Sequence, residues 1–179
     1  MLRRIAVVTA LIAAATGVLR ADAFTGSISS ADGGIDGVGS WVADPNNPTT
    51  LTWEVKTAGE LDGYALWEYK YTLSTPTKDI SHFILETSPD FTCDDLVDGI
   101  VSSTPATSTT IRTFSPGDPG RSLPWLPADI YGMKLDLAMA ATTLEAWFLS
   151  TRAPTWGDFY AKDGKEMQGT VEVAVWNAG

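Results

Sequence analysis

Apolar and polar residues alternate along several stretches of the chain, and this period of two is the pattern of half-buried β-strands. It is clearest at 50–57, TLTWEVKT, and at 66–73, LWEYKYTL, where apolar side chains share one face of each stretch. Antiparallel pairing of the two stretches in one register places Glu54 beside Lys70 and brings the aromatic residues together. We therefore predict a β-hairpin in this register.

The densest aromatic stretch is 144–164, LEAWFLSTRAPTWGDFYAKDG. Its pattern predicts a strand, a proline-marked turn and a second strand, in this order: 144–151, 152–155 and 156–162. The dipeptide Asp163–Gly164, which is typical of hairpin turns, would close the second strand. We expect this hairpin to organise the fold, with Trp147 and Trp156 covered by the other strands.

Further segments carry strand patterns: 24–29, 39–42, 80–87, 131–139 and 170–176. Segment 80–87, ISHFILET, is apolar on both faces, which indicates a strand in the middle of a sheet. The Ser- and Thr-rich segment 102–110 predicts a loop or an exposed edge. One helical turn is predicted over 93–98, because Thr92 and the following acidic residues resemble a capping box.

Turn-forming residues separate these segments at intervals typical of β-sandwiches, and no β-α-β rhythm is present. The hydrophobic content of 44% is enough for a core, and 16 glycines and 10 prolines suit tight turns. We therefore predict an all-β fold, a two-sheet antiparallel β-sandwich that is jelly-roll-like, with about eight strands.

The start of the chain carries the pattern of an export signal. Two arginines precede an apolar run over 5–19, and a small-residue cleavage site ends at Ala23. The run is shorter than the roughly 20 residues that span a membrane, so we expect no transmembrane segment in the mature chain. These features predict a signal peptide over 1–23, a β-sandwich domain over 24–179, and a protein that is secreted or held at the cell surface.

The charge balance excludes some partners. The chain has 12 basic and 22 acidic residues, a formal net charge of −10. Binding to nucleic acid or to an anionic membrane is disfavoured, because few cations are present to replace the counterions of phosphate groups. Acidity suits a soluble extracellular protein, and a protein that meets cations is the alternative.

One cysteine and one histidine limit the nucleophile and metal chemistry. Cys93 excludes a disulfide within the chain, and its neighbours Phe91 and Leu96 favour a buried thiol over an intermolecular link. His82 follows Ser81, but adjacent strand residues point to opposite faces, so we expect no Ser-His pair. A zinc site is not indicated, because the ligand spacing is absent.

Carboxylates offer two further hypotheses. Glu54 and Glu68 share a face of neighbouring strands and resemble the carboxylate pair of a glycosidase, although opposing lysines account for them more simply. A structural calcium ion is the second hypothesis, with no preferred loop. The candidate aspartates form three groups: Asp32 with Asp36, Asp94 with Asp95 and Asp98, and Asp158 with Asp163.

Exposed aromatic residues would allow sugar rings to stack on the protein. Trp125, between two prolines, is the tryptophan that we expect to face solvent. Arg152 is expected to pair with Asp158 across the turn and to hold the shape of the hairpin. The other tryptophans considered are expected in the core: Trp41, Trp53, Trp67, Trp147 and Trp156.

The segment STRAPTWGDFYAKDG at 150–164 resembles a group of bacterial exported proteins that carry a PEP-CTERM sorting tail, the surface-anchoring signal read by exosortase. Looser similarities to this group occur at four further places: 67–75, 80–86, 131–134 and 177–179. The printed sequence ends at Gly179 without the Pro-Glu-Pro motif, so we expect a truncated copy or a protein released to the medium. The resemblance implies export and a place at the cell surface or in an exopolysaccharide matrix, and it implies no catalytic residues.

The sequence thus favours an exported, non-enzymatic β-sandwich of the cell surface or extracellular matrix, with extracellular polysaccharide as a candidate partner. A carbohydrate-binding module that uses Trp125 is the alternative. A glycan-active enzyme that uses Glu54 and Glu68 is the third hypothesis. No cofactor is indicated beyond the structural calcium ion.

Overall fold

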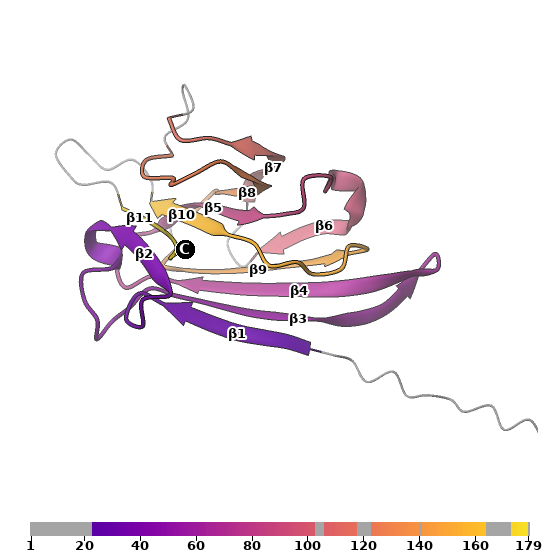
Figure 1. The fold of residues 1–179 in the computed structure, drawn as a ribbon, viewed down its shortest axis with the longest axis horizontal. Helices are drawn as coiled ribbons and strands as arrows, with labels where there is room; N and C mark the ends of the chain where they lie inside the picture. The colour runs from indigo at the N-terminus through magenta and orange to yellow at the C-terminus, as the bar shows by residue number, and fades with distance from the viewer. Residues whose placement is uncertain (1–22, 103–105, 118–122, 140, 164–172, 179) are drawn as a thin grey trace, which may run out of the picture.

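The computed structural model describes residues 23–102, 106–117, 123–139, 141–163 and 173–178. Within them the chain consists mainly of β-strands, with two short 3₁₀ turns, η1 and η2 (Figure 1). The predicted signal peptide and Gly164 lie outside these residues, except that Ala23 begins the first strand. The elements follow in this order: β1 Ala23–Ser29, β2 Ile35–Val38, η1 Gly39–Trp41, β3 Thr50–Leu61, β4 Tyr64–Ser74, β5 Ile80–Glu86, η2 Cys93–Asp95, β6 Leu96–Ser102, β7 Ala106–Phe114, β8 Ile130–Leu137, β9 Thr143–Ser150, β10 Phe159–Asp163 and β11 Ala174–Asn177.

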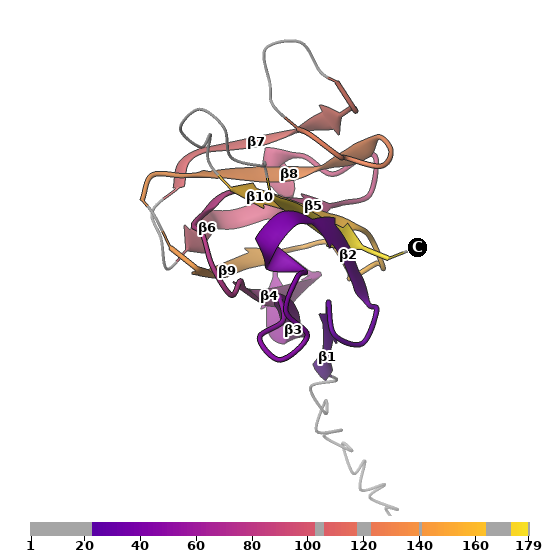
Figure 2. The ribbon, with the colours of Figure 1, turned by 90° about the vertical axis from the view of Figure 1, so that its left-hand side faces the viewer.

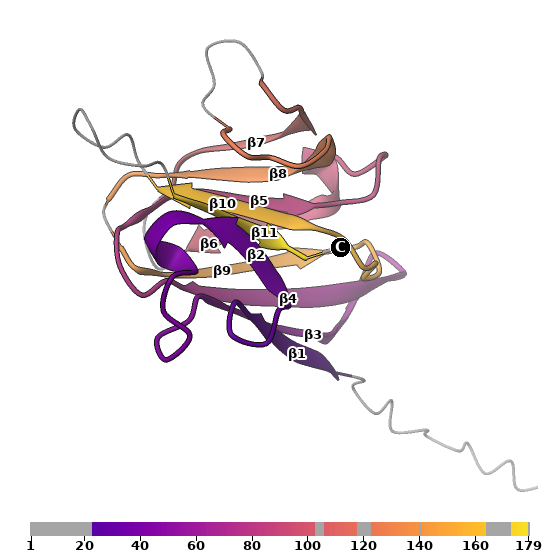
Figure 3. The same cartoon turned by 60° about the vertical axis from the view of Figure 1, so that its left-hand side comes forward.

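The strands form two antiparallel sheets that pack as a β-sandwich, which confirms the predicted fold class. One sheet has five strands in the order β1-β3-β4-β9-β6, and the other has six in the order β2-β11-β10-β5-β8-β7. Figure 2 and Figure 3 show the two layers, with β7, β8, β5 and β10 on one side and β9, β4 and β3 on the other. The structure has more strands than predicted, because β2, β6 and β7 contain residues that are uncommon in strands or lack a clear apolar alternation. As predicted, part of 102–110 forms an edge, since β7 ends the six-stranded sheet.

The predicted register of the hairpin between β3 and β4 is confirmed. Glu54 lies opposite Lys70, and Lys56 lies opposite Glu68. The side chains pair differently, because Lys56 Nζ lies 3.1 Å from Glu54 Oε1 and 3.4 Å from Glu68 Oε1. Lys70 instead pairs with Glu145 of β9, at 3.9 Å. The lysines of this face therefore link neighbouring carboxylates on three strands.

The predicted hairpin over 144–162 is wrong. β9 pairs with β4 and β6 in the five-stranded sheet, whereas β10 pairs with β5 and β11 in the six-stranded sheet. Residues 151–158, here called the crossing segment, therefore connect the two layers. Leu144 of β9 and Phe159 of β10 belong to the same core cluster. The two strands thus bury apolar faces against each other across the sandwich instead of lying side by side.

The main core fills the space between the sheets, and a second cluster covers the outer face of the six-stranded sheet. In this second cluster Ile84 of β5 packs with Leu123 and Leu126 from the segment before β8. The neighbouring residue Phe83 belongs to the main core, so β5 is buried on both faces, as predicted. Strand β5 is also central in its sheet, between β10 and β8.

Two local predictions are wrong. The strand expected over 39–42 is the turn η1, which buries Trp41 and lets its indole nitrogen donate to the Thr77 carbonyl. Cys93 is exposed rather than buried, because Phe91 takes the buried position. The helical turn predicted over 93–98 is confirmed in part: Thr92 caps η2 with a capping box, but η2 ends at Asp95 and residues 96–98 belong to β6. Among the described residues, no helix has the length and apolar character needed to cross a membrane.

Candidate functional site

A cavity of about 440 Å³ lies between the two sheets, bordered by β1 and the crossing segment, and we call it the inter-sheet pocket. Its size falls in the range of about 300–1,000 Å³ that is usual for small-molecule sites. Most lining residues are apolar or aromatic, and Glu86 is the only charged one among the described residues that line it. A site of this composition suits a small ligand with a large apolar part.

The five-stranded sheet provides one wall of the pocket. Trp53 and Val55 point inward from β3 by the period of two, and Tyr71 of β4 lies opposite Trp53. Gly26 of β1 is the other cross-strand neighbour of Trp53. A Cβ atom at Gly26 would lie only 2.3 Å from Trp53 Cζ2, so the indole of Trp53 needs glycine there.

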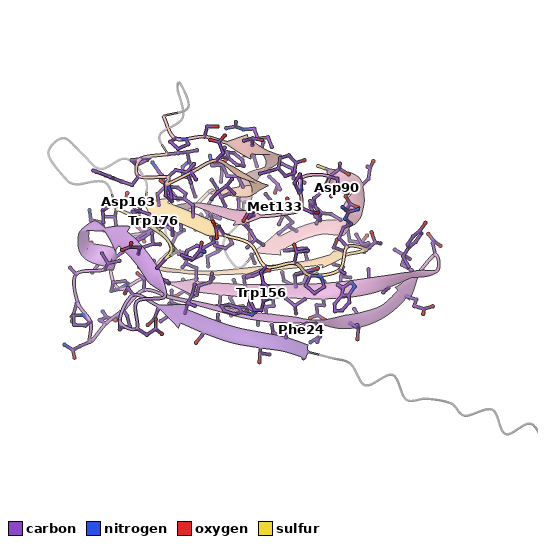
Figure 4. All side chains as sticks on the ribbon, in the orientation of Figure 1. Phe24, Asp90, Met133, Trp156, Asp163 and Trp176 are labelled. Carbon is purple, nitrogen blue, oxygen red and sulfur yellow. The ribbon has the colours of Figure 1, made fainter. Side chains whose placement is uncertain are left out.

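The six-stranded sheet and the crossing segment provide the other wall and the rim. Leu85 and Phe159 point inward, and Phe159 is 2% exposed. Trp156 is 84% exposed and meets Trp53 edge to face, with ring centroids 6.1 Å apart and planes at 86°. Figure 4 labels Trp156 and, below it in the view, Phe24 at the start of β1. The expectation that Trp156 is buried is therefore wrong, because it belongs to the crossing segment and not to a strand.

The start of the crossing segment is held by Arg152. Its guanidinium pairs with Asp90 and lies 3.8 Å from Asp95, and its carbonyl accepts a hydrogen bond of 2.6 Å from the Tyr69 hydroxyl. The hydrogen bond from Arg152 holds the pKa of Asp90 below its usual value. The predicted pair of Arg152 with Asp158 is wrong, because Arg152 turns toward the segment before η2.

The end of the crossing segment is held by β5 and β11. The backbone N–H of Asp158 donates to Glu86 Oε2 at 2.7 Å, and its carbonyl accepts from the Glu86 N–H at 2.8 Å. Asn177 Nδ2 donates to Asp158 Oδ1 at 2.5 Å, while Asn177 Oδ1 accepts from the Phe159 N–H at 3.0 Å. Both ends of the rim are therefore fixed by hydrogen bonds, and the pocket is preformed.

Tyr71 supplies a polar group inside a mostly apolar wall. Its hydroxyl has no hydrogen-bond partner among the described residues, although the side chain lines the pocket. Burial raises the pKa of Tyr71 to about 12. The hydroxyl is therefore neutral under physiological conditions and is free to donate or accept one hydrogen bond with a ligand.

The only histidine lies in a polar row on the outer face of the six-stranded sheet. Across the strands Lys162 lies beside His82, His82 beside Asp136, and Ser108 beside Asp136. Asp136 Oδ1 lies 3.2 Å from His82 Nε2 and 2.6 Å from Lys134 Nζ. Ser108 donates to Asp136 Oδ2 at 2.9 Å. This carboxylate thus serves three partners at once, as a structural group does.

The expectation that Ser81 cannot contact His82 is wrong. Ser81 Oγ lies 2.6 Å from His82 Nδ1 and 3.2 Å from the Lys162 carbonyl, because the short side chain bends along the strand. Burial and the nearby Lys134 lower the pKa of His82 to about 4. A general base works best with a pKa near the working pH, so His82 is a poor base for activating Ser81.

Glu54 and Glu68 do not form the open carboxylate pair that the glycosidase hypothesis needs. Glu54 and Glu68 both contact Lys56, and Glu68 also accepts a hydrogen bond of 3.0 Å from the Trp147 indole. Trp147 therefore lies half-buried on the outer face of the sheet and not in the core, contrary to expectation. These carboxylates neutralise a lysine, which is the structural role.

The aspartates considered for calcium have other roles in the described residues. Asp158 and Asp163 stand at opposite ends of β10, where Asp163 is 3% exposed and lies 3.8 Å from Lys78 Nζ. Asp32 accepts backbone hydrogen bonds from Ser29 and Gly34, which lower its pKa. Among the described residues, no group of three or more His, Cys, Asp or Glu side chains is placed to hold a metal ion.

Trp125 faces solvent, as predicted, with 58% of its surface exposed. Its neighbours Leu123 and Leu126 are anchored in the outer cluster of the six-stranded sheet. Trp125 and Trp156 therefore lie on different parts of the molecule and do not form one aromatic platform.

Most residues of the pocket were assigned to the core or passed over by the sequence reasoning. Alternation correctly placed Trp53 and Tyr71 on the inward faces of their strands, but it does not distinguish a pocket wall from a packed core. Gly26 and Glu86 carried no signal, because their role depends on which strands meet in space. Asn177 could have been noticed only as part of the closing N-x-G motif.

Comparisons of the chain with protein families, with curated proteins and with solved structures find no match.

Proposed function

We propose that this chain is an exported, non-enzymatic binding protein of the cell surface or extracellular matrix, and that it takes a small, largely apolar molecule into the inter-sheet pocket. The observation that carries the proposal is the apolar cavity of about 440 Å³ between the sheets, with the exposed Trp156 at its rim. Large exposed aromatic side chains next to a cavity commonly mark a binding site.

Two features support binding without catalysis. The groups that resemble catalytic residues, Ser81 with His82 and Glu54 with Glu68, lie outside the pocket and are engaged with neighbouring side chains or backbone. The rim is fixed at both ends, so the pocket does not need to close to be formed. The predicted signal peptide over 1–23 and the resemblance to exported proteins support the proposed location.

The neutral aromatic probe N-phenyl-1-naphthylamine, which fluoresces in apolar surroundings, tests the proposal. We expect saturable binding by the protein and about 3–10-fold weaker binding by the Trp156→Ala variant, because one aromatic contact is lost. Trp125→Ala is the matched control, since it removes an exposed tryptophan away from the pocket. No fluorescence gain with the native protein, or equal losses in both variants, would contradict the proposal.

Carbohydrate binding is the second candidate, and the exposure of Trp125 favours it. A flat indole presented to solvent can stack on a sugar ring without a deep pocket. Retention of the protein on gels that contain extracellular polysaccharide tests this function. Retention that is lost in Trp125→Ala and kept in Trp156→Ala would support it, and no retention would refute it.

A further inference from the structure

We infer that the inter-sheet pocket selects a small amphipathic cation, a molecule with an apolar or aromatic body and one protonated amine or quaternary ammonium group. This inference rests on the proposed binding function and names the ligand class for the same pocket. Three features of the pocket carry it: its one carboxylate, its perpendicular tryptophans and its unpaired hydroxyl.

Glu86 sets the sign of the charge. One oxygen of its carboxylate, Oε2, accepts the backbone N–H of Asp158 at 2.7 Å. The other oxygen has no hydrogen-bond or ion-pair partner among the described residues, and the lining contains no described lysine or arginine. A ligand cation would pair with this oxygen, whereas a ligand carboxylate would be repelled by it.

The aromatic residues suit a cation in the same place. Trp53 and Trp156 both line the pocket and pack edge to face, with centroids 6.1 Å apart and planes at 86°. The face of an indole attracts ammonium groups, and tryptophan does so more strongly than tyrosine or phenylalanine. The same surfaces accept the apolar body of the ligand, which explains why an apolar lining and a carboxylate occur together.

Tyr71 adds a direction for the bound molecule. Its hydroxyl is neutral and has no partner among the described residues, so it can accept an N–H from the ligand or donate to a ligand oxygen. The deep residues Leu51 and Phe159 are 4% and 2% exposed and offer only apolar surface. Glu86 and Tyr71 therefore offer the polar group of the ligand two partners, and the buried residues Leu51 and Phe159 offer its body apolar surface.

The charge of the whole chain acts in the same direction. A formal net charge of −10 attracts cations from solution and repels anions before any contact is made. This long-range effect is screened by salt, whereas the contact with a partly buried carboxylate is screened less. The two contributions can therefore be separated by varying the ionic strength.

Isothermal titration calorimetry with three naphthalene derivatives tests the inference. The probes share one aromatic body and differ in the head group: 2-naphthylmethylamine is a cation at pH 7, 2-naphthalenemethanol is neutral and 2-naphthoate is an anion. We expect the amine to bind about tenfold more tightly than the alcohol, and the carboxylate to bind most weakly. Glu86→Gln keeps an oxygen for the Asp158 N–H and should remove most of the preference for the amine, leaving the smaller part that the tryptophan faces and the net charge supply.

Two further variants test the separate contributions of the net charge and of the aromatic face. Glu54→Gln removes a carboxylate from the outer face of the five-stranded sheet, so it changes the net charge equally but leaves the pocket intact. It should keep the preference for the amine. Trp156→Leu keeps an apolar side chain but loses the aromatic face, and it should weaken binding of the amine more than that of the alcohol.

The outcomes separate the two levels of the proposal. If none of the three probes binds, the proposed binding function of the pocket fails. If the alcohol and the carboxylate bind as tightly as the amine, the pocket binds apolar molecules and the inferred preference for cations is overturned. A preference for the amine that Glu86→Gln leaves unchanged, or that Glu54→Gln abolishes, also overturns the inference.

Discussion

At the scale of single residues, His82, the only histidine, makes the stability of the protein depend on pH. It lies in the polar row on the outer face of the six-stranded sheet. The pKa of His82 is lowered to about 4 by burial and by Lys134, whereas an unfolded histidine titrates near 6.5. Between these two values the unfolded chain binds a proton that the folded chain does not. The free energy of unfolding therefore decreases as the pH falls through this window, and the decrease reaches its full size below the lower pKa.

We predict that lowering the pH from 7 to 5 decreases the free energy of unfolding by roughly 1–2 kcal/mol through His82 alone. Urea unfolding of the native protein and of His82→Gln at both pH values measures this difference, and the variant should lack it. Proton NMR offers a direct control, because the single imidazole signal should stay unshifted down to pH 5. An imidazole that titrates near 6.5 would refute the prediction.

Another prediction at this scale concerns Gly26, which lies against the indole of Trp53. Gly26→Ala places a methyl group 2.3 Å from Trp53 Cζ2, so the ring must move toward the inter-sheet pocket. We expect a loss of about 1–3 kcal/mol in the free energy of unfolding and weaker binding of N-phenyl-1-naphthylamine. Ser27→Ala changes an exposed neighbour on the same strand and should leave both unchanged. Unaltered probe binding in Gly26→Ala would mean that Trp53 does not shape the pocket.

Correct assignment of an element helped to predict exposure but did not ensure it, since Trp147 lies on the outer face of the correctly predicted strand β9. Trp53 and Tyr71 lie on regular strands, so the period of two gave their faces correctly. Trp156 and Cys93 lie in a connection and a 3₁₀ turn, where backbone direction and not alternation decides exposure. Ser81 shows a further limit, because the rule of opposite faces describes Cβ directions and not the reach of a short side chain.

At the scale of elements, the crossing segment decides the architecture. Its sequence looks like a turn because Pro154 and Gly157 interrupt the alternation, and a turn would give a hairpin. The eight residues 151–158 instead span the distance between layers, with Arg152 anchored near η2 and Asp158 anchored on β5. Alternation identified β9 and β10 as strands but carried no information on which sheet each would join.

Double-mutant cycles distinguish this anchoring from the predicted hairpin contact. We expect Arg152→Gln and Asp90→Asn to be coupled, because the guanidinium and the carboxylate are paired in the structure. Arg152→Gln and Asp158→Asn should be additive, since Asp158 is bound by Asn177 instead. The measurement is the free energy of unfolding of each single and double variant. Coupling of Arg152 to Asp158 and not to Asp90 would contradict the anchoring in the structure and support the hairpin contact predicted from the sequence.

At the scale of the whole molecule, the β-sandwich was predictable and its strand order was not. Inward-facing residues such as Leu51 and Leu73 required two apolar layers, and the complementary charges of the two stretches predicted the register of β3 and β4 correctly. The placement of β9 between β4 and β6 depends on long-range contacts that no local pattern encodes. The pocket depends on this placement, because its two walls come from different sheets and from distant parts of the chain.

A disulfide across β4 and β9 tests the strand order directly. Ser74 Oγ and Thr143 Oγ1 lie 3.4 Å apart, and the two residues are cross-strand partners. In a Cys93→Ser chain, we expect Ser74→Cys with Thr143→Cys to form an intramolecular disulfide on oxidation. The bond should raise the free energy of unfolding by about 2–4 kcal/mol over the reduced form, because it closes a long loop in the unfolded chain.

The control for this experiment pairs Ser74→Cys with Thr57→Cys in the same Cys93→Ser chain. Thr57 of β3 lies opposite Trp67 of β4, far along β4 from Ser74, which lies opposite Thr50, so no intramolecular bond should form. Peptide mapping of the oxidised proteins reads out both results. A disulfide in the control pair, or none between positions 74 and 143, would exclude the observed sheet order. The inter-sheet pocket could then not exist as described, because the crossing segment that borders it starts at the end of β9.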